Sequence, residues 1–289
     1  MPAVLYVIAT PIGNLEDITL RALRLLGEVD LIACEDTRHT RKLLTHYQIA
    51  TPTVSYHEHN ERARAVELVA RLKSGSSVAL VSDAGTPLVS DPGYALVREA
   101  IAQGVPVVPV PGASALVAAL AASGLVTDDF YFAGFLPPKS TQRRARLAAL
   151  AGVSATLIFY EAPHRIKAAL ADARQALGNR RCVVARELTK LHEEFLRGPL
   201  DEVIETLQEG DVRGELVLLV GPPSEDVPAG GQEPPRSITK EVTAFMRDEG
   251  LDQKAALKRV ARARGLSKSE AYRRLMGERA AQETADDVE

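Results

Sequence analysis

The chain has 289 residues, 46% hydrophobic and 25% charged, a composition typical of a soluble globular protein of about two domains. Its net charge of −3 argues against a globally basic nucleic-acid-binding protein. No apolar run reaches the roughly 18 residues that span a bilayer, and no basic stretch precedes the first apolar segment, so we expect a cytoplasmic protein with no membrane partner.

The first 124 residues alternate between short apolar strands and helices. Strands are predicted at 4–9, 31–34, 53–56, 78–81 and 105–110, and helices at 18–26 (capped by Asp17), 37–46, 62–73, 94–102 and from 114. This repetition predicts a parallel sheet with helices on both faces. The stretch 78–93 is central, because its apolar strand runs into two small, polar turns. Open α/β sheets bind ligands at such loops.

The alternation changes at 124–129, where we place a domain boundary. Strands are predicted at 131–133, 156–160, 182–185, 194–197 and 215–220, and helices at 142–150, 163–177 and 200–209. Consecutive strands without a helix between them indicate a mixed sheet of α+β type in a second domain, 125–221. Residues 222–236, rich in Pro, Gly and acid, predict a linker. Three amphipathic patterns then predict a basic helix-turn-helix-like domain at 237–278, followed by a disordered tail at 279–289.

Four polar or Gly/Pro-rich loops follow the strands of the first domain, at 10–14, 35–40, 82–87 and 111–114. Because carboxyl ends of parallel strands share one edge, these loops can converge. None contains a dinucleotide fingerprint or a P-loop, which argues against a Rossmann dehydrogenase and an ATPase. Cys34 and Cys182 lie in apolar runs without metal-ligand spacing, so we expect buried cysteines, no disulfide and no metal.

Seven motifs occur in order along the chain: ATPIGNLEDITLRA, ACEDTRHT, SDAGTPLVSDPG, VPGASA, FYEAPHR, KLHEEFLRG and GELVLLVG. Together they resemble the tetrapyrrole-methylase superfamily and, within it, the type I family of small-subunit ribosomal RNA methyltransferases. The resemblance covers about residues 4–221, and the helical tail resembles the accessory domain of that family. It implies a two-domain α/β enzyme, usually a homodimer, that binds S-adenosylmethionine between its domains. The implied reaction is 2′-O-methylation of a cytidine in the 16S RNA of the small ribosomal subunit.

The resemblance also implies which residues bind the methyl donor. They lie in three loops: Pro11, Ser82, Asp83, Ala84, Gly85, Thr86, Pro87, Pro111, Gly112, Ala113 and Ser114. The wider superfamily has Gly-Asp-Pro where this chain has Gly-Thr-Pro at 85–87, so no role carries over for that Asp. At Gly85 the backbone can approach a ligand closely, and replacement by Val is expected to abolish donor binding with the fold intact.

Methyl transfer from a sulfonium to an oxygen needs mainly in-line positioning. A ribose hydroxyl is a weak acid, however, so a base or a nearby cation must deal with its proton. Two clusters supply candidates: Glu35 with Asp36, and Lys190 with His192 and Glu193. The alternatives are that the first cluster caps a helix and that the second is a solvated turn. The residues alone leave the base open between these.

Cations expected to contact RNA phosphates lie in two segments. They are Lys139, Arg143, Arg144 and Arg146 after the domain boundary, and Lys258, Arg262, Lys268 and Arg273 in the tail. Between 236 and 279 twelve Lys/Arg face six Asp/Glu, a net charge of +6. The alternative for the first segment is a solvated helix face. Two other functions stay open: methylation of a tetrapyrrole-like small molecule or a protein, which the basic tail and Thr86 disfavour, and a binding protein without catalysis, which the intact donor loops disfavour.

Overall fold

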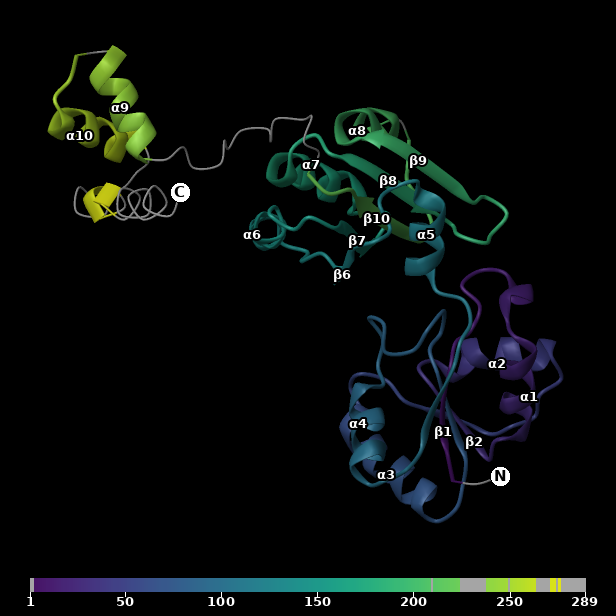
Figure 1. Ribbon diagram of the computed structural model, residues 1–289. Coiled ribbons are helices and arrows are strands. Elements are labelled where there is room, and N and C mark those ends of the chain that lie inside the picture. Colours follow the sequence, from purple (N-terminus) through teal and green to yellow (C-terminus); the bar gives the residue numbers. More distant parts are fainter. Residues whose placement is uncertain are drawn as a thin grey trace. The chain divides into compact units, whose positions relative to one another are not determined.

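The computed structural model describes residues 3–208, 210–223, 238–248, 250–263, 271–273 and 275–276 (Figure 1). The chain forms two compact units, Met1–Val227 and Pro228–Glu289. Most of the predicted linker and all of the predicted tail at 279–289 lie outside the described residues. Within the described ranges no helix is long and apolar enough to cross a membrane.

The first sheet has five strands, all paired in parallel, in the order β3-β2-β4-β1-β5. The strands are β1 (Leu5–Ile8), β2 (Leu31–Cys34), β3 (Thr53–Ser55), β4 (Val78–Val81) and β5 (Val107–Val110). Every residue of β2 and β4 is buried, as expected of strands covered on both faces. The predicted parallel sheet is therefore confirmed.

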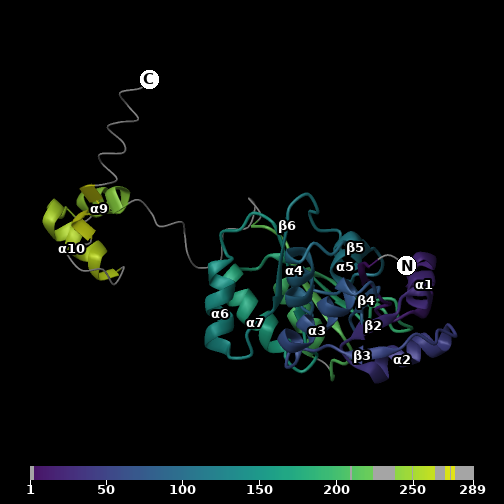
Figure 2. The same ribbon diagram turned by 90° about the horizontal axis from the view of Figure 1, so that it is seen from below.

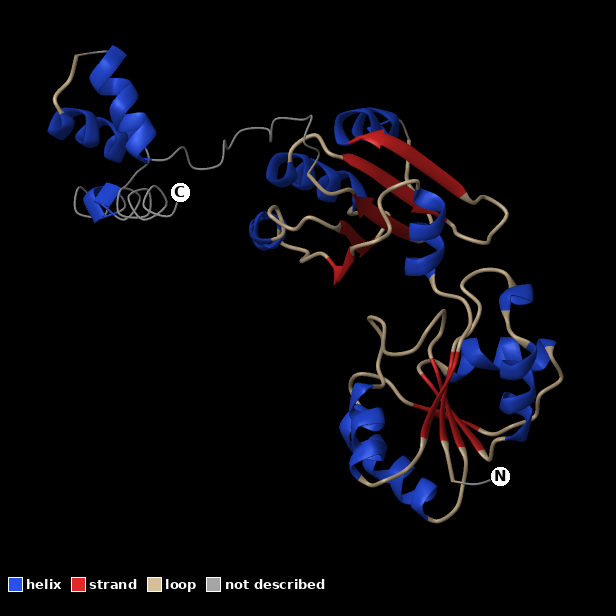
Figure 3. Cartoon of the chain, viewed as in Figure 1, coloured by secondary structure: helices blue, strands red, loops and turns tan. Residues whose placement is uncertain are grey.

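Helices cover both faces of this sheet (Figure 3). On one face α1 (Leu20–Glu28) and α2 (Thr37–His46) pack on Ile32, Cys34 and Val81. On the other face α3 (Glu61–Lys73) and α4 (Tyr94–Ala102) pack on Ala33 and Leu80 and lie side by side (Figures 1 and 2). Alternate residues of each strand thus enter opposite halves of the core.

The start of α1 differs from the prediction, which made Asp17 its cap. Asp17 instead lies in a short 3-10 turn, η1 (Leu15–Asp17), which begins when Asn14 accepts the N–H of Glu16. Thr19 is the residue with extended backbone, and its hydroxyl accepts the N–H of Ala22 at 3.1 Å. The capping hydroxyl therefore comes two residues later than predicted, because a separate turn precedes the helix.

The second sheet is mixed, with the order β6-β7-β10-β8-β9. Its strands are β6 (Phe130–Phe135), β7 (Thr156–Glu161), β8 (Arg181–Arg186), β9 (Glu194–Pro199) and β10 (Leu216–Val220). Only the pairing of β6 with β7 is parallel, which confirms the predicted mixed sheet. The last strand in the sequence, β10, occupies the centre.

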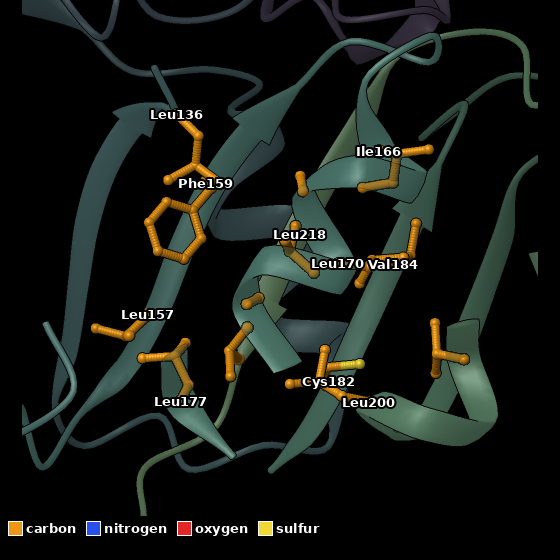
Figure 4. Close-up of a cluster of buried hydrophobic side chains, with 14 of the residues drawn as sticks. Leu136, Leu157, Phe159, Ile166, Leu170, Leu177, Cys182, Val184, Leu200 and Leu218 are labelled. Atoms are coloured by element: carbon orange, nitrogen blue, oxygen red, sulfur yellow. The ribbon is translucent and has the colours of Figure 1, made fainter. Parts of the chain in front are cut away.

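One face of the second sheet carries α6 (Ser140–Ala149), α7 (Ile166–Leu177) and α8 (Leu200–Gln208). Figure 4 shows the core beneath them, where Leu170 of α7 lies among side chains from the strands, including Val184 and Leu218. Cys182 is buried in this core and Cys34 in the first sheet, and both are free thiols.

The opposite face of the second sheet is covered by α5 (Ala115–Ser123), although this helix follows β5 of the first sheet. Its Ala119 and Leu120 pack with Val183 of β8 and Val217 of β10. Strands β7, β8 and β10 are apolar on both faces, so their second face also has to be covered. The segment 1–124, predicted as the first domain, thereby contributes a helix to the core of the second sheet.

The second unit contains α9 (Ile238–Asp248) and α10 (Gln253–Ala263), and residues 271–273 and 275–276 are also helical. Its small core includes Val242, Val260 and Leu275. Helix α10 is capped by Asp252, whose Oδ1 accepts the N–H of Ala255 at 2.6 Å.

Candidate active site

Three of the predicted loops meet at the carboxyl edge of the first sheet. Thr10 N–H donates to the carbonyl of Gly85 at 2.9 Å, and Gly85 N–H donates back to the carbonyl of Thr10 at 3.1 Å. Thr86 Oγ1 donates to the carbonyl of Ala113 at 3.2 Å, which adds the loop after β5. Gly85 has φ 81°, a conformation that favours glycine, and a Cβ there would lie 3.2 Å from Ile12 Cγ2.

A cavity of about 270 Å³ opens beside these loops within the first unit. One wall comes from the first sheet and the segment that leads into α5, and the other from the second sheet and its turns. The lining residues are Ile12, Asp83, Ala84, Gly85, Thr86, Val89, Ser90, Asp91, Ser114, Ala115, Phe135, Tyr160, Leu188, Glu215, Leu216 and Val217. Mostly apolar walls with a few converging polar groups are typical of small-molecule sites.

A β-bulge in β6 builds the aromatic part of the wall. Between Phe132 and Phe135 the pairing with β7 slips by one residue, and Gly134 in between has φ 67°. Because of the extra residue, Phe132 and Phe135 both reach Tyr160, with ring centroids 4.9 and 5.7 Å away. Phe135 stays 57% exposed, so it presents an apolar ring at the cavity.

The turn after β8 closes the cavity against the β1–α1 loop. A Cβ on Gly13 would lie 2.5 Å from Lys190 Cγ and 2.9 Å from the carbonyl oxygen of Leu188, so the two segments touch at backbone distance. Lys190 Nζ donates to Glu187 Oε1 at 2.9 Å and to Glu215 Oε2 at 3.3 Å. Lys190, a predicted catalytic candidate, therefore stabilises a turn beside the cavity.

Asp91 is an acidic group of the cavity that the sequence analysis missed. Burial raises the pKa of Asp91 to about 6, and the charges of Glu35 and Asp83 add to the increase. Tyr160 lines the same cavity, and burial raises the pKa of its phenol, with the charge of Asp91 adding to the increase. The sequence signal that points to Asp91 is its position in the second small, polar turn after β4.

The first catalytic cluster divides into two environments. Asp36 caps α2, because its Oδ1 accepts the N–H of Arg38 at 2.8 Å, and the Arg38 side chain lowers the pKa of Asp36 to about 2. Asp36 N–H in turn donates to Asp83 Oδ1 at 3.0 Å. Glu35 is partly buried, and burial and then the Asp83 charge raise its pKa.

The remaining candidates of the second cluster lie on the exposed turn. His192 is exposed, and Glu193 Oε2 accepts the N–H of Thr189 at 2.6 Å. Glu35, Asp36, His192 and Glu193 are absent from the residues that line the cavity. For Asp36 and Glu193 the structure shows the turn or capping role that the sequence left open as the alternative.

The predicted donor residues lie at or near the cavity. Asp83, Ala84, Gly85, Thr86 and Ser114 line it directly. Pro11 and Ser82 line a neighbouring cavity, Ala113 accepts the hydroxyl of Thr86, Pro87 is buried, and Pro111 and Gly112 are exposed. Binding of a methyl donor by these residues stays a prediction.

The structure contradicts the prediction that Arg143 contacts RNA. Its side chain is 4% exposed, and its Nε donates to Asp172 Oδ2 at 2.7 Å. The helical period explains this, since Arg143 and Leu147 are one turn apart on the buried face of α6. Arg143 therefore holds α6 on α7 and is removed from the RNA-binding candidates.

The other predicted RNA-binding cations lie at the surface. Lys139, Arg144 and Arg146 are exposed; Arg144 is 3.9 Å from Asp172, and Arg146 stacks over the ring of Tyr131. In the second unit Lys258 and Arg273 are exposed and Arg262 belongs to α10, whereas Lys268 lies outside the described residues.

The FYEAPHR motif has a structural role. Glu161, at the end of β7, is 2% exposed and pairs with Arg165 Nε at 3.1 Å. Arg165 also donates to the carbonyl of Leu136, next to Phe135 of the cavity wall. Among the described residues, no group of three or more His, Cys, Asp or Glu side chains is arranged to hold a metal ion.

Residues 4–204 match the family model of the tetrapyrrole (corrin/porphyrin) methylases. The chain belongs to the tetrapyrrole methylase family. It is 49% identical to ribosomal RNA small subunit methyltransferase I of Halalkalibacterium halodurans and 50% identical to the protein of that name from Vibrio cholerae, and each alignment covers 93% of both chains. The protein of that name from Bacillus subtilis is 46% identical over 93% of this chain and 92% of its own.

Solved structures of other proteins share the fold at lower identity. Diphthine synthase superposes with a TM-score of 0.59 at 19% identity, over 75% of this chain and 90% of its own. Uroporphyrin-III C-methyltransferase from Thermus thermophilus, complexed with S-adenosylhomocysteine, gives a TM-score of 0.53 at 22% identity, over 75% of this chain and 96% of its own. The predicted family and fold class are thus confirmed.

Proposed function

We propose that this protein transfers the methyl group of S-adenosylmethionine to a cytidine 2′-hydroxyl in the 16S RNA of the small ribosomal subunit. The observation that carries the proposal is identity of 46–50%, over 93% of this chain, with three relatives named ribosomal RNA small subunit methyltransferase I. The cavity at the edge of the parallel sheet supports it, because its chemistry suits both the donor and the reaction.

The cavity suits a methyl donor in charge and in shape. S-adenosylmethionine carries a sulfonium cation, and the carboxyl groups of Asp83 and Asp91 give the cavity negative charge. Phe135, Leu188 and Val217 offer an apolar wall for an adenine ring. Gly85 has no side chain, so the space beside Ile12 that a Cβ would occupy stays open.

We assign the proton of the ribose hydroxyl to Asp91. A carboxyl group with a pKa of about 6 is mostly ionised at neutral pH and is a stronger base than an ordinary aspartate. The hydroxyl oxygen attacks the methyl carbon as the carbon–sulfur bond breaks, and the electron pair of that bond goes to sulfur. The hydroxyl proton passes to Asp91 and then to solvent. Glu35 supports the basicity of Asp91, because its charge raises the pKa of Asp91.

The exposed cations Lys139, Arg144 and Arg146, together with Lys258 and Arg273 of the second unit, would contact phosphates of the ribosomal RNA. The family resemblance adds a homodimer and a cytoplasmic location to the proposal. Asp36, Lys190 and Glu193 keep the supporting contacts described above, since their charged groups are bonded to neighbouring groups of the protein.

The test uses the purified protein, radiolabelled S-adenosylmethionine and small subunits from cells that lack this protein. Label in an alkali-resistant dinucleotide of the 16S RNA is the expected result, because 2′-O-methylation blocks cleavage by alkali. The variant Asp91→Asn is the matched control: it should bind donor and transfer little label. Tight donor binding without label in RNA would contradict the proposal and favour a small-molecule or protein acceptor. Absence of donor binding would favour a non-catalytic binding protein.

A further inference from the structure

A second cavity, of about 230 Å³, lies beside the first at the same edge of the sheet. Its lining includes Pro11 and Ser82 from the loops after β1 and β4, and His39 and Lys42 from α2. Asp83 lines both cavities. The two cavities are therefore neighbours that share one acidic side chain.

The helix beside the second cavity is basic along its whole length. Helix α2 contains Arg38, Arg41 and Lys42 as well as two histidines, and no Asp or Glu. His39, Lys42 and His46 follow one another at helical spacing, so they form one stripe, and the first two of them reach the cavity. None of the cations predicted from the sequence to contact RNA lies in this helix.

Two cations of α2 are free to bind an anion. Arg38 is 2.8 Å from Asp36, but the ion pairs of the described residues include neither Arg41 nor Lys42, and both are exposed. On α6, by contrast, Arg143 is buried against Asp172 and Arg144 lies near the same carboxylate. Of these two helices, α2 therefore has the cations that form fewer ion pairs within the described part of the protein.

The second cavity is lined by charged groups of both signs. Lys42 of α2 and the carboxylate of Asp83, which is shared with the first cavity, both line it. A nucleotide has the matching polarity, with an anionic phosphate and neutral ribose hydroxyls that can donate to a carboxylate. A simple anion would gain from the cations but would be repelled by Asp83.

We infer that the second cavity and α2 bind the phosphodiester backbone of the substrate RNA, with Lys42 and Arg41 on phosphates and the ribose directed past Asp83 toward the first cavity. This inference rests on the proposed function and adds the path by which the RNA strand reaches the methyl donor. Contacts to phosphates fix the register of a strand without reading its sequence, so α2 positions the RNA.

The double variant Arg41→Ala/Lys42→Ala tests the inference. The matched control is Arg71→Ala/Lys73→Ala, which removes two cations from the last turn of α3, next to the amino end of β4 and so at the opposite edge of the sheet. Calorimetry measures the affinity for S-adenosylmethionine, methylation kinetics give KM and kcat for small subunits, and a titration in salt gives the slope of RNA affinity.

The α2 variant should bind the donor like the wild type, raise KM for small subunits by about 10-fold with a smaller change in kcat, and reduce the salt slope by about 1.4, as expected for two lost contacts to single-stranded RNA. The control should stay within about twofold of the wild type. An unchanged KM and slope in the α2 variant, with an active wild type, would overturn the inference and leave the proposed function standing. Lost donor affinity would also overturn it, since α2 would then support the first cavity. An inactive wild type that binds donor would refute the proposed function itself.

Discussion

Substitution of Gly13 by Ala should disturb the first cavity, the proposed site of the methyl donor, without unfolding the protein. The added Cβ would lie 2.9 Å from the carbonyl oxygen of Leu188 and 2.5 Å from Lys190 Cγ, against an ordinary contact of 3.4 Å or more. The Lys190 side chain can move, but the carbonyl belongs to the backbone of the turn. This turn must therefore retreat by about half an ångström, and it carries Leu188, which packs in one hydrophobic cluster with Ile12 and lines the first cavity.

The size of the effect follows from that displacement. Since a misplacement of about 1 Å costs roughly 10²-fold in rate, half of it should lower kcat by about 10-fold. We expect the affinity for S-adenosylmethionine to fall by a similar factor, because Ile12 and Leu188 both line the cavity. Overpacking of this kind destabilises proteins by about 1–3 kcal/mol, so the melting temperature should fall by only several degrees.

The assay combines calorimetry with S-adenosylmethionine, methylation of small subunits at saturating donor, and thermal unfolding. Gly152→Ala is the matched control, because no atom lies within 4 Å of the Cβ it would add. If Gly13→Ala retained donor affinity and kcat within twofold of this control, the close contact between the loop after β1 and the turn after β8 would not shape the cavity, and our reasoning would fail.

Three further predictions concern single groups. Wild-type kcat should rise with pH, reach half its maximum near pH 6 and then level off, because Asp91 accepts a proton only when it is ionised. The variant Asp91→Asn should lower kcat by about 10²-fold or more and abolish this pH dependence. At pH 8 it should be at least as stable as the wild type. Arg143→Met should destabilise the protein by about 3–5 kcal/mol by leaving Asp172 buried without its cation, and Arg143→Met/Asp172→Leu should recover most of the loss in thermal unfolding. Gly85→Ala should weaken donor binding by about 10-fold in calorimetry, because φ 81° strains alanine and its Cβ would crowd Ile12; equal affinity would contradict the placement of the donor.

Local patterns were sufficient to predict both sheets. Four of the five strands of the first sheet, all except β3, are short apolar runs followed by a polar or Gly/Pro-rich loop, and that pattern implies parallel strands whose loops share an edge. Consecutive strands β8 and β9 likewise indicated the mixed second sheet. The loops at 82–87 and 111–114 could be selected as the candidate site because small residues and prolines mark them in the sequence.

Features that depend on distant partners could not be predicted. The helical period places Arg143 on the same face of α6 as Leu147, but its burial also requires the carboxylate of Asp172, which lies on the next helix and cannot be assigned as its partner from the sequence. Helix α5 is apolar all round, so no pattern in it indicates which sheet it covers. Asp91 lines the cavity because of the path of the whole loop after β4, which no single residue of that loop indicates.

The central place of β10 has a consequence for how the protein is made. The first sheet is complete once β5 ends at Val110, whereas the second sheet lacks its middle strand until Val220 has been synthesised. At about 5–20 residues per second, the ribosome adds that interval in on the order of ten seconds. Throughout this time the nascent chain has no β10, and so lacks Leu216 and Val217 of the cavity wall. The first cavity, where we propose that the methyl donor binds, is therefore completed only near the end of the synthesis of the first unit.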